Sequence, residues 1–515
     1  MYHYFSLILL KRVNMKILLF LIFTPLSALI KAQNCKECAC YVQKAKQLIE
    51  KPNFDTLLYL SNHIIDAKCI VDDYHLYKAH LLAGFKQLID SELNAKKKEE
   101  IKKGLPYSEF WFNNDSLLPI VNREGKYGFV DKNLDVKISY QYDAATSFSM
   151  SLGKYAEVKR NNKDYYLDIH QNEYLISYSL TNLSHDVKIL ILRMPELKQM
   201  PDSICRYTNL KILYVNYTKI ESLPKEIAQL HNLEELYLVE NPLNRLPDDF
   251  GKLKKLIAFY ASDCKIRELP ISFSELSALK RCNLRNNQIN MLPNNFGNLK
   301  KLEELDLSWC PVTQLPNSLH ELNNLKGLRL IGTKITVLPD YISTFKNLRE
   351  LSISNLSSPL PPRFGELQAL KSLTLPNAYF EKFPREILEL KNLHTLWLFG
   401  SKLTELPKRI DKLKKLQLLD VSNTKIKAIP PSIGNLKRLH YLAIGKSLTK
   451  LPKQIGQLDN LESLYLFNNK ISKLPDDIVN LKKLSSLYLG GNPISKEEIE
   501  KFKAKMPNCK ISLTL

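Results

Sequence analysis

A Leu-Pro pair returns every 23 residues from Leu223-Pro224 to Leu474-Pro475. Around each pair the full unit reads L-x-x-L-x-L-x-x-N-x-I-x-x-L-P-x-x-I-x-x-L-x-x. A unit of this length cannot bury its own leucines, so it must stack on copies of itself. The repeat therefore predicts a solenoid, a fold that usually acts by presenting a surface.

Thirteen regular units and one irregular unit follow one another from about residue 180 to the end. The irregular copy runs from Val187 to Met200-Pro201. The regular units begin at Leu210, Leu233, Leu256, Leu279, Leu302, Leu325, Leu348, Leu370, Leu393, Leu416, Leu439, Leu461 and Leu484. The units that begin at Leu348 and Leu439 are one residue short. The missing residue falls between the strand and the Leu-Pro turn, where a loop can absorb it.

This pattern resembles the leucine-rich repeat family, in its 23-residue "LP" subtype. The resemblance implies an α/β leucine-rich repeat solenoid, in which each L-x-x-L-x-L segment forms one strand of a parallel concave sheet. Residues of the Leu464 and Leu466 type point to the core, and the residues between them point to the concave face, since side chains alternate along a strand. The Leu-Pro segment forms the outer wall. After the last unit we expect a cap, made of a helix that begins at Ser495 and a strand over 511–513.

The asparagine position of the unit is expected to be structural. It holds asparagine in some units and a small hydroxyl or thiol residue in others: Asn241, Asn287, Asn469, Asn492, Thr218, Thr333, Thr424, Ser401, Cys264 and Cys310. Each of these side chains can hydrogen-bond backbone groups that the bend after the strand leaves unpaired. We therefore interpret Cys264 and Cys310 as backbone ligands and not as nucleophiles.

The residues at the concave positions differ from unit to unit, and we place the candidate site there. Tyrosine, tryptophan and arginine are the residue types that anchor partners, although tyrosine also suits any strand. The candidates for partner binding are Tyr214, Tyr237, Tyr260, Arg281, Arg285, Asp306, Arg329, Trp397, Phe399, Tyr465, Phe467 and Tyr488. Because neighbouring strands lie about 4.8 Å apart, the first three tyrosines should form an aromatic ladder. We also expect the three arginines to flank Glu304 and Asp306, and the later rings to form two separate aromatic patches.

Changes in the pattern of apolar, aromatic and turn residues divide the whole chain into segments. We predict a signal peptide over residues 1–32, with Met15 as the initiator, and a helical segment over 33–104. A β-rich module over 105–179 resembles the WG-repeat family, on the run Gly125-Lys126-Tyr127-Gly128-Phe129. A second copy that starts at Asn162 has lost both glycines. We assign residues 180–515 to the array that resembles leucine-rich repeats, together with its C-terminal cap.

A signal peptide implies a secreted, periplasmic or cell-surface protein that retains no stable membrane span after cleavage. An uncleaved anchor is the alternative. In an oxidising compartment Cys35, Cys38, Cys40 and Cys69 would form disulfides rather than a zinc site, with connectivity open. The net charge of +21 owes much to lysine doublets at one fixed place in the repeat, such as Lys254-Lys255. This regularity favours a solvated outer face over a nucleic-acid groove.

The sequence carries no recognisable catalytic motif, and we expect neither an enzyme nor a cofactor or metal site. Glu304 and Asp306 could suggest paired carboxylates, but with arginines nearby we expect ion pairs. The function that the sequence favours is binding of a protein or peptide along the concave face, with a glycan as the second ligand class and no nucleic acid. A structural adhesin or spacer at the cell envelope is the leading alternative, and a carbohydrate-active enzyme is the remote one.

Overall fold

The computed structural model describes residues 117–121, 125–130, 136–146, 155–177, 183, 185–192 and 194–513. The predicted signal peptide and helical segment, with the cysteines at positions 35, 38, 40 and 69, lie outside the described residues. The chain divides into two compact units between Ser177 and Tyr178.

The described part of the first unit consists of two antiparallel sheets. One sheet contains β1 (Leu118–Val121), β2 (Tyr127–Val130) and β3 (Val136–Tyr142). The other contains β4 (Ala144–Ala145), β5 (Tyr155–Arg160), β6 (Lys163–Asp168) and β7 (Glu173–Ser177). Phe129, Ile138, Tyr142 and Leu167 form their buried core. The expected β-rich segment is therefore present.

The turn between β5 and β6 closes without glycine. Asn161 and Asn162 both adopt a left-handed backbone, with φ of 51° and 61°. Gly125, between β1 and β2, also has a left-handed backbone, with φ of 77°. Asparagine tolerates this region better than other non-glycine residues, so the two-residue turn still closes.

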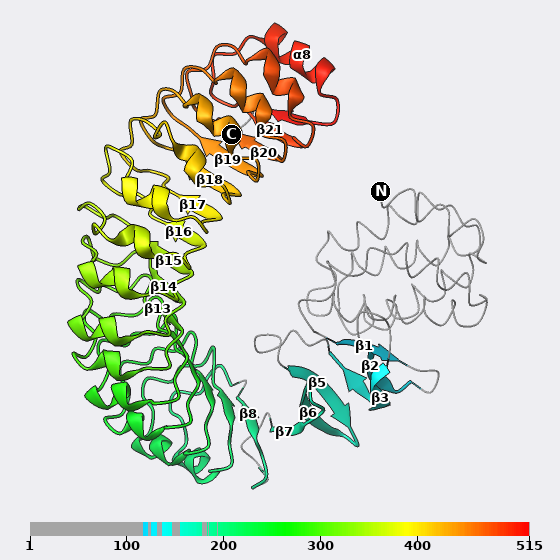
Figure 1. The fold of residues 1–515 in the computed structure, drawn as a ribbon. Coiled ribbons are helices and arrows are strands. Elements are labelled where there is room, and N and C mark those ends of the chain that lie inside the picture. Colours follow the sequence, from blue (N-terminus) through cyan, green and yellow to red (C-terminus); the bar gives the residue numbers. More distant parts are fainter. Residues whose placement is uncertain are drawn as a thin grey trace, which may run out of the picture. The chain divides into compact units, whose positions relative to one another are not determined.

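The second unit is a solenoid whose inner layer is one continuous parallel sheet (Figure 1). Each strand from β8 to β22 pairs with the next. The strands are β8 (Ile189–Ile191), β9 (Ile212–Tyr214), β10 (Glu235–Tyr237), β11 (Ala258–Tyr260), β12 (Arg281–Asn283), β13 (Glu304–Asp306), β14 (Gly327–Leu330), β15 (Glu350–Ile353), β16 (Ser372–Thr374), β17 (Thr395–Trp397), β18 (Leu418–Val421), β19 (Tyr441–Ile444), β20 (Ser463–Tyr465), β21 (Ser486–Tyr488) and β22 (Lys510–Ser512).

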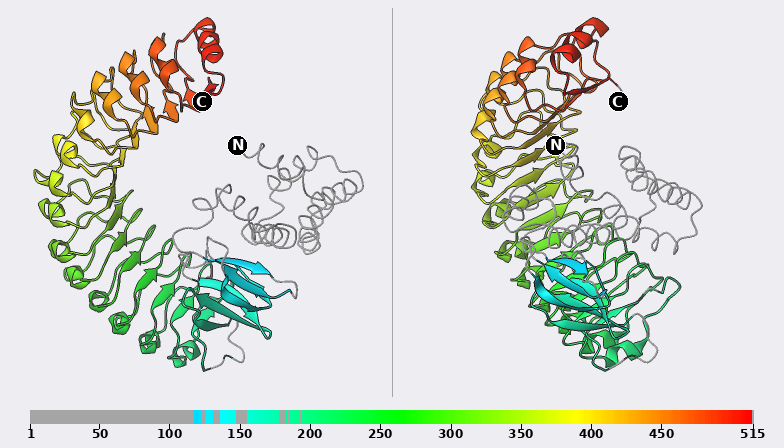
Figure 2. Two further views of the ribbon diagram at one scale, coloured as in Figure 1. Left: turned by 45° about the vertical axis from the view of Figure 1, so that its right-hand side comes forward. Right: turned by 90° about the vertical axis from the view of Figure 1, so that its right-hand side faces the viewer.

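The outer wall consists of short 3₁₀ helices, nine of which start directly after the proline of the Leu-Pro pair or of the Met-Pro, Phe-Pro or Ile-Pro pair that replaces it. They are η1 (Asp202–Arg206), η2 (Lys225–Gln229), η3 (Phe250–Lys252), η4 (Ile271–Glu275), η5 (Phe296–Asn298), η6 (Asn317–Glu321), η7 (Asp340–Thr344), η8 (Phe364–Glu366), η9 (Arg385–Glu389), η10 (Ile410–Lys412), η11 (Pro431–Asn435), η12 (Lys453–Gln457) and η13 (Asp476–Asn480). Proline suits this place because its fixed φ matches the turn and it need not donate a ladder hydrogen bond. The helices line the convex side of the solenoid in every view (Figures 1 and 2).

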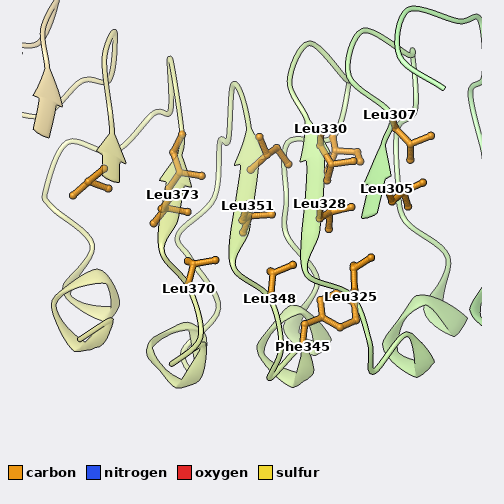
Figure 3. Close-up of a cluster of buried hydrophobic side chains, with 14 of the residues drawn as sticks. Leu305, Leu307, Leu325, Leu328, Leu330, Phe345, Leu348, Leu351, Leu370 and Leu373 are labelled. Carbon is orange, nitrogen blue, oxygen red and sulfur yellow. The ribbon is translucent and has the colours of Figure 1, made fainter. Parts of the chain in front are cut away.

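Leucines fill the space between sheet and outer wall. Leu305, Leu328, Leu351 and Leu373 come from four successive strands and are 0% exposed. Figure 3 shows them in one row, with Leu325, Leu348 and Leu370 in a second row nearer the helices. Because each leucine contacts its counterparts in the neighbouring repeats, the core is shared along the whole unit.

The two short units keep their strands in register. Leu351 pairs with Leu373, and Leu442 pairs with Leu464, each across 22 residues instead of 23. The deletion is absorbed in the loop after the strand, as the sequence predicts.

The expected C-terminal cap is also present. Helix α8 (Lys496–Lys505) begins at Ser495, whose side chain accepts a hydrogen bond of 3.1 Å from the amide of Glu498. Phe502 and Met506 cover the last leucines, and β22 adds the closing strand. The final repeat is therefore not left with an exposed core.

We predict that Leu351→Ala destabilises the array by about 2–5 kcal/mol, because it leaves a cavity in a core shared by three repeats. Urea unfolding followed by circular dichroism measures the change. Thr374→Ala, a substitution of similar size on the concave surface of β16, is the control and should change stability by less than about 0.5 kcal/mol. Equal effects of the two substitutions would contradict the shared core.

Candidate functional site

The asparagine column fixes the loop that leaves each strand, and so positions the edge of the concave face. Asn287 is 5% exposed and donates to the carbonyls of Ala261 and Leu284 at 2.7 and 2.8 Å. Its Oδ1 accepts from the amide of Ile266 at 3.0 Å. Asn241 and Asn469 make equivalent bonds. This column joins neighbouring repeats through buried backbone groups.

The cysteines in this column have the same structural role. The thiols of Cys264 and Cys310 donate to the carbonyls of Leu238 and Leu284 at 3.2 and 3.1 Å. Burial raises the pKa of each thiol to about 11, so little thiolate forms near neutral pH. These two residues are backbone ligands, as expected from the sequence.

Three tyrosines form a stacked ladder across β9, β10 and β11, which we call the tyrosine ladder. The rings of Tyr214 and Tyr237 lie 4.0 Å apart, and those of Tyr237 and Tyr260 lie 4.8 Å apart. The ladder is therefore as the sequence predicts. Tyr237, however, is only 8% exposed, and its hydroxyl donates to Glu235 at 2.6 Å. It supports its two neighbours and offers little surface of its own.

The arginines in the middle of the sheet have other partners than expected. In register, Arg281 lies opposite Glu304 and Arg329 opposite Asp306. Yet Arg329 makes a bidentate pair with Glu350, at 2.8 and 2.5 Å, and this pair raises its pKa. Arg281 donates to the hydroxyl of Tyr260 at 3.1 Å. The expected flanking is confirmed in strand register, and Arg329 also interacts with Asp306 and Glu304 at longer range than with Glu350.

The two carboxylates of β13 do not form the ion pairs that we expected. Asp306 accepts from the amide of Ser308 at 2.8 Å, and Glu304 is exposed. No ion pair of residues 194–513 involves either of them. Arg285 is exposed and also has no carboxylate partner among these residues, so it is the concave arginine most available to a ligand.

The later aromatic residues form one cluster and not two patches. We call it the aromatic cluster: Trp397, Phe399, Tyr441, Tyr465, Phe467 and Tyr488. Trp397 lies 6.2 Å from Phe399 and 6.3 Å from Tyr441 across β18. Tyr441 lies 4.9 Å from Tyr465, whose ring stacks on Tyr488 at 4.3 Å. The prediction of two patches was wrong because it did not include Tyr441.

Tyr441 occupies the first outward position of its strand, whereas the other candidate rings occupy the second and third. A comparison of all three outward positions along the repeats would have found it. From this position its side chain bridges two strands to reach Trp397 and closes the gap between the patches. Burial raises the pKa of Tyr441 to about 12, so its hydroxyl remains a hydrogen-bond donor over the ordinary pH range.

Asp420 lies on β18, between the strands that carry Trp397 and Tyr441, and is 6% exposed. Its Oδ1 accepts from the amide of Ser422 at 2.8 Å. Burial is the largest influence on this carboxyl and raises its pKa above the usual range. A carboxylate is thus held almost out of solvent between the strands that carry these two rings, at a cost in solvation.

Trp309 is a further exposed aromatic residue that the sequence analysis did not select. It lies at the edge of the concave face after β13, is 53% exposed, and has a left-handed backbone with φ of 63°. Most other repeats place asparagine, aspartate or glycine at this position. Its ring packs over Gly332, where a Cβ would approach the ring to 2.6 Å.

Each of the four lysine doublets of the outer turns has at least one lysine that is bonded to a neighbouring repeat. Lys254 pairs with Glu275 at 2.9 Å, and Lys300 pairs with Glu321. Lys255 donates to Asn232 at 2.7 Å. This supports a solvated outer face. Among the described residues no group of histidine, cysteine and carboxylate side chains could hold a metal ion, and no helix has the length and apolarity to cross a membrane.

Comparisons with known proteins agree with this geometry. Models described as "Leucine rich repeat" and "Leucine-rich repeat region" match residues 208–266 and residues 272–373, 384–449 and 432–504. A search of the curated proteins found no significant match.

Three solved structures illustrate the likeness. A leucine-rich repeat protein of Leptospira interrogans shares 34% identity, over 64% of this chain and 90% of its own length, with a TM-score of 0.58. The TLR13–ssRNA13 complex shares 25% identity, over 64% of this chain and 50% of its own, with a TM-score of 0.50. An internalin of Listeria monocytogenes shares the fold at 22% identity, over 58% and 84% of the two chains, with a TM-score of 0.50.

We predict that Asp420→Asn stabilises the protein at neutral pH and weakens the pH dependence of stability. The pKa of this carboxyl is raised on folding, so the unfolded chain loses its proton first and stability falls as pH rises through the folded pKa. A tenfold difference in proton affinity between the folded and unfolded chains corresponds to about 1.4 kcal/mol. Thermal unfolding of both proteins between acidic and neutral pH measures the difference. A stability difference between the two proteins that stays constant with pH would contradict the argument.

Proposed function

The repeat array of this chain belongs to the leucine-rich repeat family, and from that premise we propose that its concave face binds a protein or peptide without catalysing a reaction. The observation that carries the proposal is the aromatic cluster. Six large side chains from β17 to β21 lie in contact with one another on the inner face, and the core contains none of them. Such an apolar surface is costly to leave in water unless a partner covers it.

The residue types also suit a protein partner. Tryptophan and tyrosine combine a large apolar surface with a polar group and few rotatable bonds, so they lose little entropy on binding. Most of these rings are partly buried by one another and are therefore held in place before a ligand arrives. The proposed contact residues are the aromatic cluster with Tyr214, Tyr260 and Arg285. Tyr237, Arg281, Asp306 and Arg329 support this surface through bonds to their neighbours.

The cellular location belongs to the same proposal. The predicted signal peptide supports a secreted, periplasmic or cell-surface protein, in which the concave face meets partners outside the cytoplasm. A glycan is the second ligand class. The alternative of a structural spacer makes a different prediction, since a spacer does not require any concave side chain for partner capture.

We predict that Trp397→Ala lowers the affinity for a protein or peptide ligand by about tenfold or more, as removal of a central aromatic anchor does. A peptide selected on the full chain from a random display library serves as the ligand, and fluorescence anisotropy measures its affinity. Ile271→Ala is the matched control, because Ile271 is 77% exposed on the outer wall. We expect the control to bind as the wild type does.

Arg285→Glu tests the polar part of the same face. It reverses a charge that has no partner among residues 194–513, whereas a change at Arg329 would also break its pair with Glu350. Failure of the library to yield any peptide, or equal affinity in Trp397→Ala and the wild type, would favour the spacer.

A further inference from the structure

Six lysines lie on the loops that leave the carboxyl ends of strands β18, β19 and β20. We call them the basic rim: Lys425, Lys427, Lys446, Lys450, Lys470 and Lys473. All six are exposed. Lys425 and Lys470 directly follow the buried column residues Thr424 and Asn469, so their backbone is fixed by the hydrogen bonds of that column. The rim therefore has a defined place beside the concave face.

The basic rim gathers six lysines on the loops of three successive repeats, and these loops (422–427, 445–450 and 467–473) contain no acidic residue. On the outer turns Lys254, Lys346 and Lys412 pair with glutamates of neighbouring repeats, at 2.8 to 2.9 Å. No ion pair within residues 194–513 includes a lysine of the rim. Lys473 interacts with the carboxylate of Asp476 at longer range, but no carboxylate of residues 194–513 lies at ion-pair distance from a lysine of the rim.

The basic rim belongs to the same repeats as the aromatic cluster. Trp397 and Phe399 lie on or directly after β17, and Tyr441, Tyr465 and Tyr488 lie on β19, β20 and β21. On the concave face of these repeats the one carboxylate in a described strand, Asp420, is almost wholly buried. An approaching ligand therefore meets apolar rings bordered by positive charge.

The way in which the rings pack argues for a peptide over a nucleic acid. A single-stranded nucleic acid binds through bases that stack on open ring faces. Here Tyr465 and Tyr488 stack on each other at 4.3 Å, and Tyr441 lies 4.9 Å from Tyr465. The faces of these rings are largely occupied by other rings, and their edges and hydroxyl groups remain for a ligand. Edges and hydroxyls suit apolar side chains and peptide amides.

We propose that the partner of this end of the array is an acidic peptide segment. Its apolar side chains contact the aromatic cluster, and its aspartates or glutamates face the basic rim. This assignment rests on the proposed function and specifies, in addition, that the partner is negatively charged. Complementary charge at the edge of an apolar contact speeds association and selects among partners.

The test is a selection of random display peptides on the full-length protein and on a charge-reversed variant, Lys425→Glu with Lys446→Glu and Lys470→Glu. We expect peptides selected on the wild type to be rich in aspartate and glutamate beside aromatic or aliphatic residues. For such a peptide, the charge-reversed variant should lose about tenfold or more in affinity, with a weaker salt dependence.

The matched control reverses three exposed lysines of the outer turns, Lys301→Glu with Lys414→Glu and Lys482→Glu. It changes the net charge of the protein by the same amount, so an effect of total charge alone would appear in both variants. We expect affinity for the acidic peptide to change less than about twofold in this control. Equal losses in the two variants would overturn the proposal.

Other outcomes separate the inference from the proposed function. Enrichment of neutral or basic peptides whose binding is lost in Trp397→Ala would overturn the acidic partner and leave the concave site in place. Enrichment of no peptide would overturn both. An oligouridine that binds the wild type more tightly than any selected peptide, and loses affinity in the rim variant, would assign the rim to single-stranded nucleic acid and overturn the peptide.

Discussion

Burial of leucines between successive coils is the interaction on which the rest of this structure depends. No coil can hide its own apolar residues, and each is completed by the coil before and the coil after it. The core residues Leu328, Leu351 and Leu373 are fully buried although their strands contain only three or four residues. The same stacking sets the distance between equivalent residues on the concave face. It therefore brings the three rings of the tyrosine ladder into contact with one another, and likewise the six rings of the aromatic cluster. The proposed binding surface is thus a direct product of core packing.

Stacking alone would leave many backbone groups buried without partners, and the asparagine column satisfies them. A single side chain such as Asn287 contacts a carbonyl of its own coil and a carbonyl and an amide of the preceding coil. Threonine and cysteine can replace it because each still donates to a carbonyl. This tolerance explains how the chain varies the column without losing the bend that ends each strand. It also explains why two buried thiols need no chemical function.

The lysines of the array differ in whether a carboxylate lies within ion-pair distance. On the outer turns several lysines pair with glutamates of adjacent repeats, so part of the charge there is compensated within the fold. On the loops beside the aromatic cluster, lysines stand without such partners. Net charge by itself does not distinguish these two surfaces, because the difference lies in which side chains the coil brings within reach of one another.

The sequence by itself determined every feature of the array that follows from the 23-residue repeat. The strand positions, the inward leucines, the absorption of two one-residue deletions and the cap at Ser495 all depend on alternation and spacing along one chain. The face on which each candidate residue lies was predictable for the same reason. Only the tertiary structure decided the partners: Glu350 for Arg329, the burial of Tyr237 between two rings, and the bridge that Tyr441 makes to Trp397. Long side chains reach across one or two strands in directions set by their rotamers, and a repeat pattern specifies the neighbouring strand without specifying that direction.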